Sequence, residues 1–146
     1  MLHKDSVALK GAVSIVVYDK LMQVKEQREI PNLVVAVGKN YIAARMVGIV
    51  NEMSHMAIGS GTTAPASGNT APQTELGRVA LDSDTASGAS VTYFALFPAG
   101  TGTGAVTEAA ILNAASAGTM LCRTVFPVIN KGADDSLAIT WQVTVL

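Results

Sequence analysis

The sequence predicts a mainly β domain, an antiparallel β-sandwich of about eight strands with one short helix. In residues 136–146, apolar side chains occupy every odd position, which is the period of a strand with one buried face. Further short runs rich in β-branched residues recur along the chain between turn residues. A parallel α/β sheet would need a helix between successive strands, and most of those helices are missing.

The expected strands follow from these runs. Residues 11–18 are rich in β-branched side chains, and residues 22–28 begin with alternating apolar positions, so a hairpin is predicted around the turn at Asp19 and Lys20. Pro31 and Asn32 end that pattern. The remaining strands are expected at 33–37, 54–60, 79–81, 91–97, 110–114, 119–126 and 136–146.

One helix and two long loops complete the expected architecture. Tyr41, Ile42, Arg45 and Met46 follow three-and-four spacing, which predicts a helix over about 39–49 that covers one end of the core. Turn residues dominate the two expected surface loops. These loops are 59–69 and 98–104, while 70–77 is expected to hold a short helical turn and 82–90 a polar turn.

Length and composition predict a single domain that belongs to an assembly. The 146 residues are read as an N-terminal arm, 1–10, and one β-sandwich domain, 11–146. Charged residues make up 14% of the chain, against about 25% in typical soluble domains. Because a free monomer needs charged surface to stay soluble, we expect a subunit of a larger assembly, which includes a homo-oligomer. The alternative is a neutral, Thr-rich domain that is simply poor in charge.

The charge pattern argues against nucleic-acid binding. Net charge is −1, and the ten Lys and Arg residues are scattered, so the sequence holds no basic patch that would neutralise several phosphates. The N-terminus has no apolar signal-peptide region, and no apolar stretch approaches about 20 residues, the length of a membrane span. We therefore expect synthesis in the cytoplasm and no membrane partner.

No catalytic, metal-binding or cofactor-binding residues are nominated, and an enzyme is not expected. Gly100, Gly102 and Gly104 have the spacing G-x-G-x-G, which departs from the dinucleotide and P-loop patterns, so a flexible turn is favoured. His55 stands beside methionines and is expected to be hydrogen-bonded and partly buried. Metal-ligand spacing and a G-x-S-x-G elbow are both missing. The single cysteine, Cys122, lies in an apolar run and is expected to be a buried, inert thiol.

Two arginines interrupt apolar strand runs. Arg78 and Arg123 would each point to solvent or clamp a carboxylate across an interface. Glu75 and Glu108, which lie in or near expected turns, are the candidate partners. Asp134 and Asp135 are expected to form a solvated turn before the last strand.

Several motifs carry a resemblance when taken in order. They are Asn32-Leu-Val-Val with residues 38–46, Met56-Ala-Ile-Gly-Ser-Gly-Thr-Thr-Ala-Pro65, Thr74-Glu-Leu-Gly-Arg78, Phe97-Pro-Ala-Gly, Thr107-Glu-Ala109 and Phe126-Pro-Val-Ile-Asn-Lys-Gly132. Together they resemble small virion proteins of tailed bacteriophages, and are similar to the N-terminal attachment domain of phage tail-collar fibre proteins. The chain departs from that pattern at Ala110, where glycine is common, and it stops where a fibre would continue into a shaft.

The resemblance implies a non-enzymatic structural protein of the virion, without a cofactor. A capsid decoration or cement protein that bridges major capsid subunits is expected, and a trimer would suit local threefold axes. The alternative is a tail, collar or baseplate adaptor that anchors fibres. A carbohydrate-binding or hydrolytic β-domain is a third hypothesis, poorly supplied with aromatic side chains. The candidate interface residues are Met1, Leu2, His3, Lys4, Thr62, Thr63, Pro65, Arg78, Thr101, Thr103 and Arg123.

Overall fold

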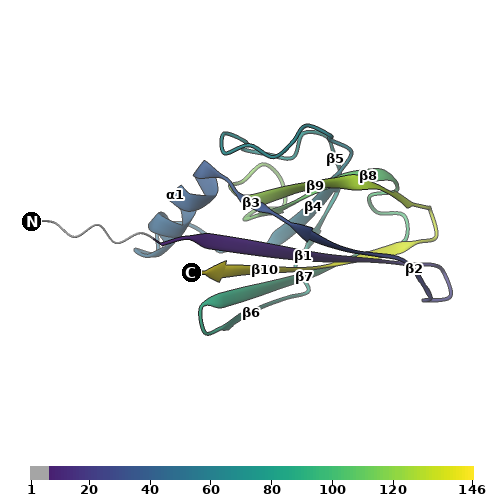
Figure 1. The fold of residues 1–146 in the computed structure, drawn as a ribbon, viewed down its shortest axis with the longest axis horizontal. Helices are drawn as coiled ribbons and strands as arrows, with labels where there is room; N and C mark the ends of the chain where they lie inside the picture. The colour runs from purple at the N-terminus through teal and green to yellow at the C-terminus, as the bar shows by residue number, and fades with distance from the viewer. Residues whose placement is uncertain (1–6) are drawn as a thin grey trace, which may run out of the picture.

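A computed structural model describes residues 7–146 and confirms the predicted fold class. Two antiparallel sheets of five strands each face one another, and a short helix lies at one end (Figure 1). The first sheet has the strand order β2-β1-β10-β7-β6, and the second has the order β3-β9-β8-β4-β5. The elements are β1 (Leu9–Tyr18), β2 (Val24–Pro31), β3 (Leu33–Val34), α1 (Ala36–Arg45), β4 (His55–Gly59), β5 (Glu75–Ala80), β6 (Ser83–Ser87), β7 (Ser90–Phe97), β8 (Gly104–Leu112), β9 (Met120–Lys131) and β10 (Ser136–Val145).

The last strand is central to the first sheet, where it lies between β1 and β7. Leu137, Ile139 and Trp141 have no exposed surface, and Val143 is buried as well. This confirms the alternation that the sequence predicts. The alternation ends at Val145, which is 44% exposed because the strand has reached the end of the core there.

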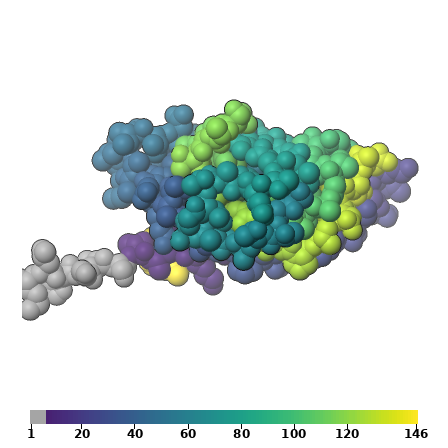
Figure 2. Space-filling model, turned by 90° about the horizontal axis from the view of Figure 1, so that it is seen from above, coloured from purple at the N-terminus to yellow at the C-terminus, as the bar shows by residue number. Residues whose placement is uncertain are grey.

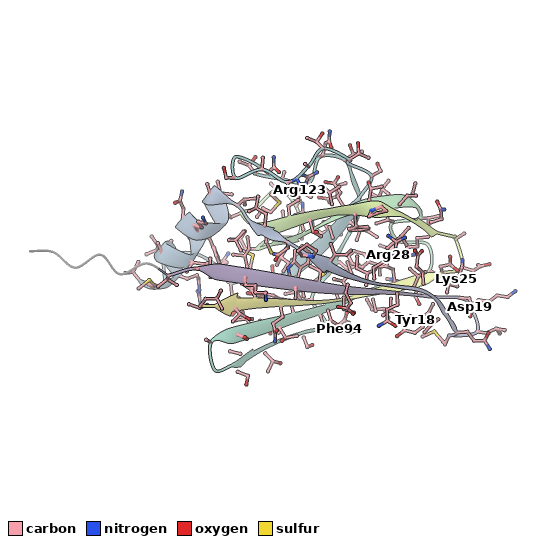
Figure 3. All side chains as sticks on the ribbon, in the orientation of Figure 1. Tyr18, Asp19, Lys25, Arg28, Phe94 and Arg123 are labelled. Carbon is pink, nitrogen blue, oxygen red and sulfur yellow. The ribbon has the colours of Figure 1, made fainter. Side chains whose placement is uncertain are left out.

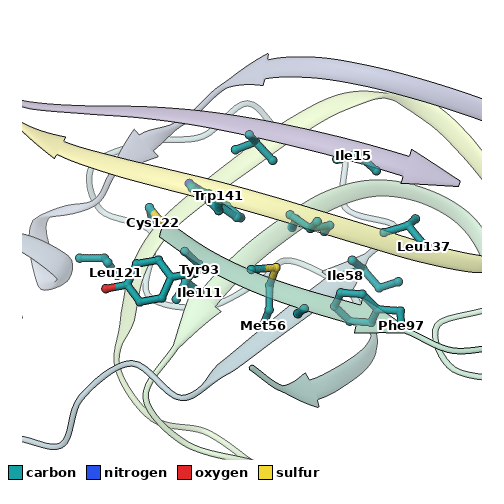
Figure 4. Packing of buried hydrophobic residues seen from close by; sticks show 14 of the residues in the cluster. Ile15, Met56, Ile58, Tyr93, Phe97, Ile111, Leu121, Cys122, Leu137 and Trp141 are labelled. Carbon is teal, nitrogen blue, oxygen red and sulfur yellow. The ribbon is translucent and has the colours of Figure 1, made fainter. Parts of the chain in front are cut away.

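One main hydrophobic cluster fills the space between the sheets (Figure 4). The first sheet contributes Ile15, Phe97 and Trp141, and the second contributes Met56 and Ile58. Each inward side chain comes from alternate positions of its strand, which is how two facing sheets share a core. Cys122 is also fully buried, as predicted, and burial raises the pKa of its thiol well above the ordinary value.

The helix is present but its predicted bounds are wrong. It begins at Ala36 rather than near Lys39, and it ends at Arg45. The next residues form a turn that closes at Gly48, whose φ of +71° is a conformation that favours glycine. Tyr41 packs into the core, and α1 lies against β9, so the helix does cover one end of the sandwich. It is too short to cross a membrane, and it is the one helix within residues 7–146.

Two predicted segments in the middle of the chain are wrong. Residues 82–90 were expected as a polar turn, but they contain β6 and a two-residue turn at Gly88 and Ala89. The helical turn expected over 70–77 gives way to β5, which begins at Glu75. Both strands form because their backbones pair with neighbouring strands. That pairing leaves no periodic pattern in the side chains, so the sequence does not reveal it.

The hairpin of β8 and β9 is longer than the sequence predicts. β8 begins at Gly104 and contains Glu108, and β9 continues through Pro127 to Lys131. The register shifts between Val106 and Glu108 mark an irregularity opposite Pro127. A bulge of this kind is where a strand tolerates proline, because one ladder hydrogen bond is already missing.

The expected N-terminal arm falls partly outside the described residues. Residues 1–6, which include the candidates Met1, Leu2, His3 and Lys4, are among those not described. Leu9 and Lys10 were also assigned to the arm, but they pair with Val145 and Thr144 and belong to β1. The sandwich therefore begins two residues earlier than the sequence suggested.

Candidate functional site: a loop anchored on a buried ion pair

The hairpin of β8 and β9 brings a buried carboxylate and a buried guanidinium together. Arg123 lies opposite Ala110, so Glu108 is its diagonal neighbour on the sheet. Arg123 Nε donates to Glu108 Oε2 at 2.9 Å. Nη2 lies 2.9 Å from the same oxygen but is not aligned for a hydrogen bond, so that contact is one of charge. Both residues are 1% exposed or less, and a charge buried to this extent needs its partner.

The ion pair also fastens the long loop over residues 60–74. The backbone N–H groups of Gly61 and Thr74 donate to Glu108 Oε1 at 2.9 Å and 2.7 Å, and that of Gln73 donates to Oε2 at 2.9 Å. Arg123 Nη1 donates to the carbonyl oxygen of Thr63 at 3.0 Å and to Asn69 Oδ1 at 3.1 Å. Five hydrogen bonds therefore run from one ion pair to the two ends and the middle of the loop.

These contacts set the ionisation of the carboxyl group. Burial alone would raise the pKa of Glu108, but the hydrogen bonds from Thr74, Gln73, Arg123 and Gly61 outweigh it. The pKa of Glu108 is therefore lower than its ordinary value. Glu108 is thus a charged acceptor at neutral pH, as the loop requires.

Close backbone approach explains the glycine at the start of the loop. A Cβ atom on Gly61 would lie 2.5 Å from Glu108 Oε1 and 2.5 Å from the Cβ of Gln73. The Thr107 hydroxyl donates to the Gly61 carbonyl oxygen at 2.8 Å, so this residue is held from both sides. Glycine is needed here for space rather than for an unusual φ.

The outer surface of the loop is uncharged and hollowed. Residues 60–74 include no Asp, Glu, Lys, Arg or His, and most of them are exposed. From above, the loop forms the teal surface in Figure 2, with a depression of about 370 Å³ that reaches down to Arg123. Figure 3 shows Arg123 beneath this loop. We call this uncharged surface, residues 60–74, the loop platform.

The second Gly/Thr-rich loop, before β8, packs down onto the second sheet. Gly102 is buried, and a Cβ there would lie 2.4 Å from Ile58 Cδ1. Its positive φ of +69° is a further reason for glycine at this position. Thr101 is half-buried and Thr103 is exposed, so this loop offers less free surface than the loop platform.

Arg78 acts as an internal brace. Its Nε and Nη2 atoms donate to the two carboxylate oxygens of Glu75 at 3.1 Å and 2.6 Å. Nη1 donates to the carbonyl oxygens of Ala114 and Ala117 at 2.9 Å and 3.0 Å. Arg78 therefore ties β5 to the connection between β8 and β9, and its side chain is 9% exposed.

Several predicted interface residues take different roles in the structure. The structure unites Thr62, Thr63 and Pro65 in the loop platform, where Thr62 and Thr63 are exposed and Pro65 is half-buried. The expectation that Arg123 is an interface residue is corrected, because its side chain is buried and hydrogen-bonded beneath the loop. Glu108 was the right partner for it, but the expectation that Glu108 lies near a turn is wrong. Gly61 and Gln73 were missed, since their backbone groups carry the contact and leave no side-chain signal.

A second buried charge lies at the end of β9. Lys131 is 1% exposed, and its ammonium donates to the carbonyl oxygens of Pro98 at 2.9 Å and Asp135 at 2.7 Å. Asp135 Oδ2 accepts from Lys25 Nζ and from the Gly132 N–H, each at 2.7 Å. Asp135 is 5% exposed, which corrects the expectation of a solvated turn at this residue.

Neither centre has the composition of a metal site. Within residues 7–146, no three His, Cys, Asp or Glu side chains lie together as metal ligands would. His55 is half-buried and its Nδ1 lies 2.8 Å from Ser54 Oγ, as expected for a hydrogen-bonded histidine. The donors and acceptors of the two buried centres are mostly backbone groups that join loops to strands.

An apolar groove of about 770 Å³ lies at the helix end of the molecule. Its lining comes from residues 7–9 at the start of β1, from 32–34 around β3, from α1 and Met46 after it, and from Val145 of β10, with Lys39 as the single charged residue. Met46, at its margin, is 83% exposed. Exposed aliphatic surface of this kind is typical of a protein that contacts others.

No family model, no curated protein and no solved structure matches this chain.

Proposed function

We propose that the protein is a non-enzymatic structural component of a tailed-phage virion, a capsid decoration or cement protein that bridges neighbouring major capsid subunits. One observation carries the proposal. The loop platform is a fifteen-residue surface without a charged side chain, and a fully buried ion pair holds it from beneath. A loop that is ordered before binding pays less conformational entropy when it binds.

The mechanism is adhesion between subunits. The platform carries no charged side chain and the groove has a single one, so covering them against another protein avoids most of the large cost of burying ions. A protein that binds the assembled shell but not free subunits stabilises the shell by mass action. After synthesis in the host cytoplasm, the protein would then remain part of the virion.

Copy number in purified virions tests this proposal. Quantitative mass spectrometry of the phage that encodes the chain should give hundreds of copies, in proportion to the major capsid protein, because decoration repeats over the shell. A dozen copies or fewer, in order of magnitude, would favour the alternative of a tail, collar or baseplate adaptor, since adaptors follow the closed symmetry of the tail. Virions without the chain would contradict both.

A matched pair of variants tests the platform itself. Thr62→Glu adds a charge to the exposed platform, and Gln27→Glu adds the same charge to an exposed position on β2. We expect Thr62→Glu to weaken co-sedimentation with capsids and Gln27→Glu to leave it unchanged, with both variants folded by circular dichroism. Equal binding by the two variants would mean that the platform is not the contact surface.

A further inference from the structure

Strand β6 is an edge strand that buries nothing. It pairs with β7 at the margin of the first sheet, and all five of its residues are exposed (Figure 1). Both faces of the strand are therefore in solvent. Because its side chains bury no apolar surface, backbone pairing with β7 is what holds the strand in place.

The two edges of the first sheet differ in how they are protected. β2, at the opposite edge, carries Lys25, Glu26, Arg28 and Glu29 and ends at Pro31, and its register with β1 shifts at one point. Charges, proline and bulges are the usual means by which an edge strand is kept from pairing with another chain. β6 has one charge, Asp84, no proline and no shift in its register with β7.

The backbone of β6 offers a regular set of free groups. A two-residue turn at Gly88 and Ala89 makes Ser87 and Ser90 a hydrogen-bonded pair. Since hydrogen-bonded pairs alternate along an antiparallel ladder, Asp84 and Ala86 direct their N–H and C=O groups away from β7. Within residues 7–146, no turn or loop backbone group bonds to either residue.

We propose that β6 is a strand-addition site for a second copy of this chain. Two β6 strands would pair antiparallel across a twofold axis at Thr85, which joins the two first sheets into one continuous sheet. This register uses the outward groups of Asp84 and Ala86, and it places each Asp84 opposite the partner's Ala86. A register centred on Asp84 would oppose two like charges, and one centred on Ala86 would need Gly88 of the turn.

The inference goes beyond the proposed function and stands apart from it. In place of the trimer that the phage resemblance implies, it proposes a twofold pair, which is also the commonest symmetry of homo-oligomers. Its test uses the isolated full-length protein. If the chain is missing from virions, the proposed function is wrong. If the isolated protein does not dimerise, the proposal for the edge strand is wrong.

Analytical ultracentrifugation over a range of concentrations tests the pairing. We expect a reversible monomer–dimer equilibrium for the native chain and a monomer for Ala86→Pro, which removes an outward N–H without breaking the ladder with β7. Circular dichroism and urea unfolding would establish that the proline variant is folded. A native chain that is monomeric at every concentration, or a dimer that survives Ala86→Pro, would overturn the proposal.

Two charged variants test the register without proline. Ala86→Asp places like charges opposite each other twice in the dimer, and we expect its Kd to rise roughly tenfold. Ala86→Lys places a cation opposite each Asp84, and we expect its Kd to fall. Gln27→Asp, on the β2 edge, serves as the control and should leave the Kd unchanged. If both Ala86 variants weaken the dimer equally, the twofold register at Thr85 is wrong.

Discussion

Two cations on β9 are buried to the same extent but neutralised in different ways. Arg123, near the start of the strand, has the carboxylate of Glu108 against it. Lys131, at the end of the strand, is surrounded by backbone carbonyl oxygens, while the carboxylate of Asp135 turns toward Lys25. Both residues are 1% exposed. The first centre is a matched ion pair, and the second is a cation solvated by the chain.

The pKa values express this difference. Burial lowers the pKa of Lys131, and the nearby charge of Asp135 offsets this lowering in part, so its charged form is disfavoured in the folded state. The pKa of Glu108 is also lowered, but there its charged form is favoured by hydrogen bonds that outweigh burial. The charges of the Arg123 centre therefore stabilise the fold, whereas the charge of Lys131 is held in the fold at a cost.

Removing the guanidinium should have the largest effect. Arg123→Met leaves Glu108 as an unpaired buried charge and frees the middle of the loop platform. We expect a loss of about 3–5 kcal/mol in the free energy of unfolding, measured by urea denaturation. Hydrogen exchange at Gly61, Gln73 and Thr74 should speed up in the same variant. A loss below about 1 kcal/mol, the range of exposed pairs, would contradict the matched-pair description.

Acid should weaken the Arg123 centre next. The pKa of Glu108 lies below the ordinary value of about 4.3, so the unfolded state takes up the proton first as pH falls. The stabilising contribution is present above that ordinary value and disappears as pH falls through the folded-state pKa. Urea unfolding of the native chain and of Glu108→Gln at several pH values should show a shallower acid dependence in the variant. Identical pH profiles would mean that Glu108 does not hold a lowered pKa.

Replacing the lysine should cost less than replacing the arginine. Lys131→Met keeps the volume of the side chain and removes a disfavoured charge, but it leaves the Asp135 carbonyl oxygen without its side-chain donor, while the Pro98 carbonyl oxygen keeps the bond from the Thr101 N–H. We expect a loss of about 1–3 kcal/mol in the free energy of unfolding, the cost of unsatisfied buried groups. A loss as large as that of Arg123→Met would show that the two centres are equally dependent on charge.

The smallest effect should come from the exposed end of the second centre. Lys25 is the solvent-facing partner in this contact, with 46% of its side chain exposed, and Asp135 keeps its bond from the Gly132 N–H when Lys25 is removed. Lys25→Ala should therefore shift the urea midpoint only slightly, and added salt should reduce the difference from the native chain. A salt-independent loss would instead indicate that Lys25 is required to hold the turn.

The sequence predicts the parts of this fold in which apolar side chains face the core. β10 follows from apolar periodicity and the buried Cys122 from the apolar run around it, and Glu75 and Glu108 are chosen correctly as partners of the arginines. β6 was missed because a strand that buries no side chain has no apolar period to detect. The loop platform was recognised as a loop, but its anchoring was not, since backbone N–H groups from residues 61 to 74 make the contact and any sequence supplies those.

The pairing of β1 with β10 has a consequence for the order of folding. Ten residue pairs join these strands, from Leu9 with Val145 to Tyr18 with Ser136, and the Leu146 N–H donates to the Ala8 carbonyl oxygen at 2.8 Å. All strands of the second sheet are synthesised before β10, but β1 and β7 stay unjoined until β10 leaves the ribosome. Closing a loop of this length makes the step slow. A nascent chain therefore carries two open strand edges until β10 emerges, and that interval is when chaperones would protect it.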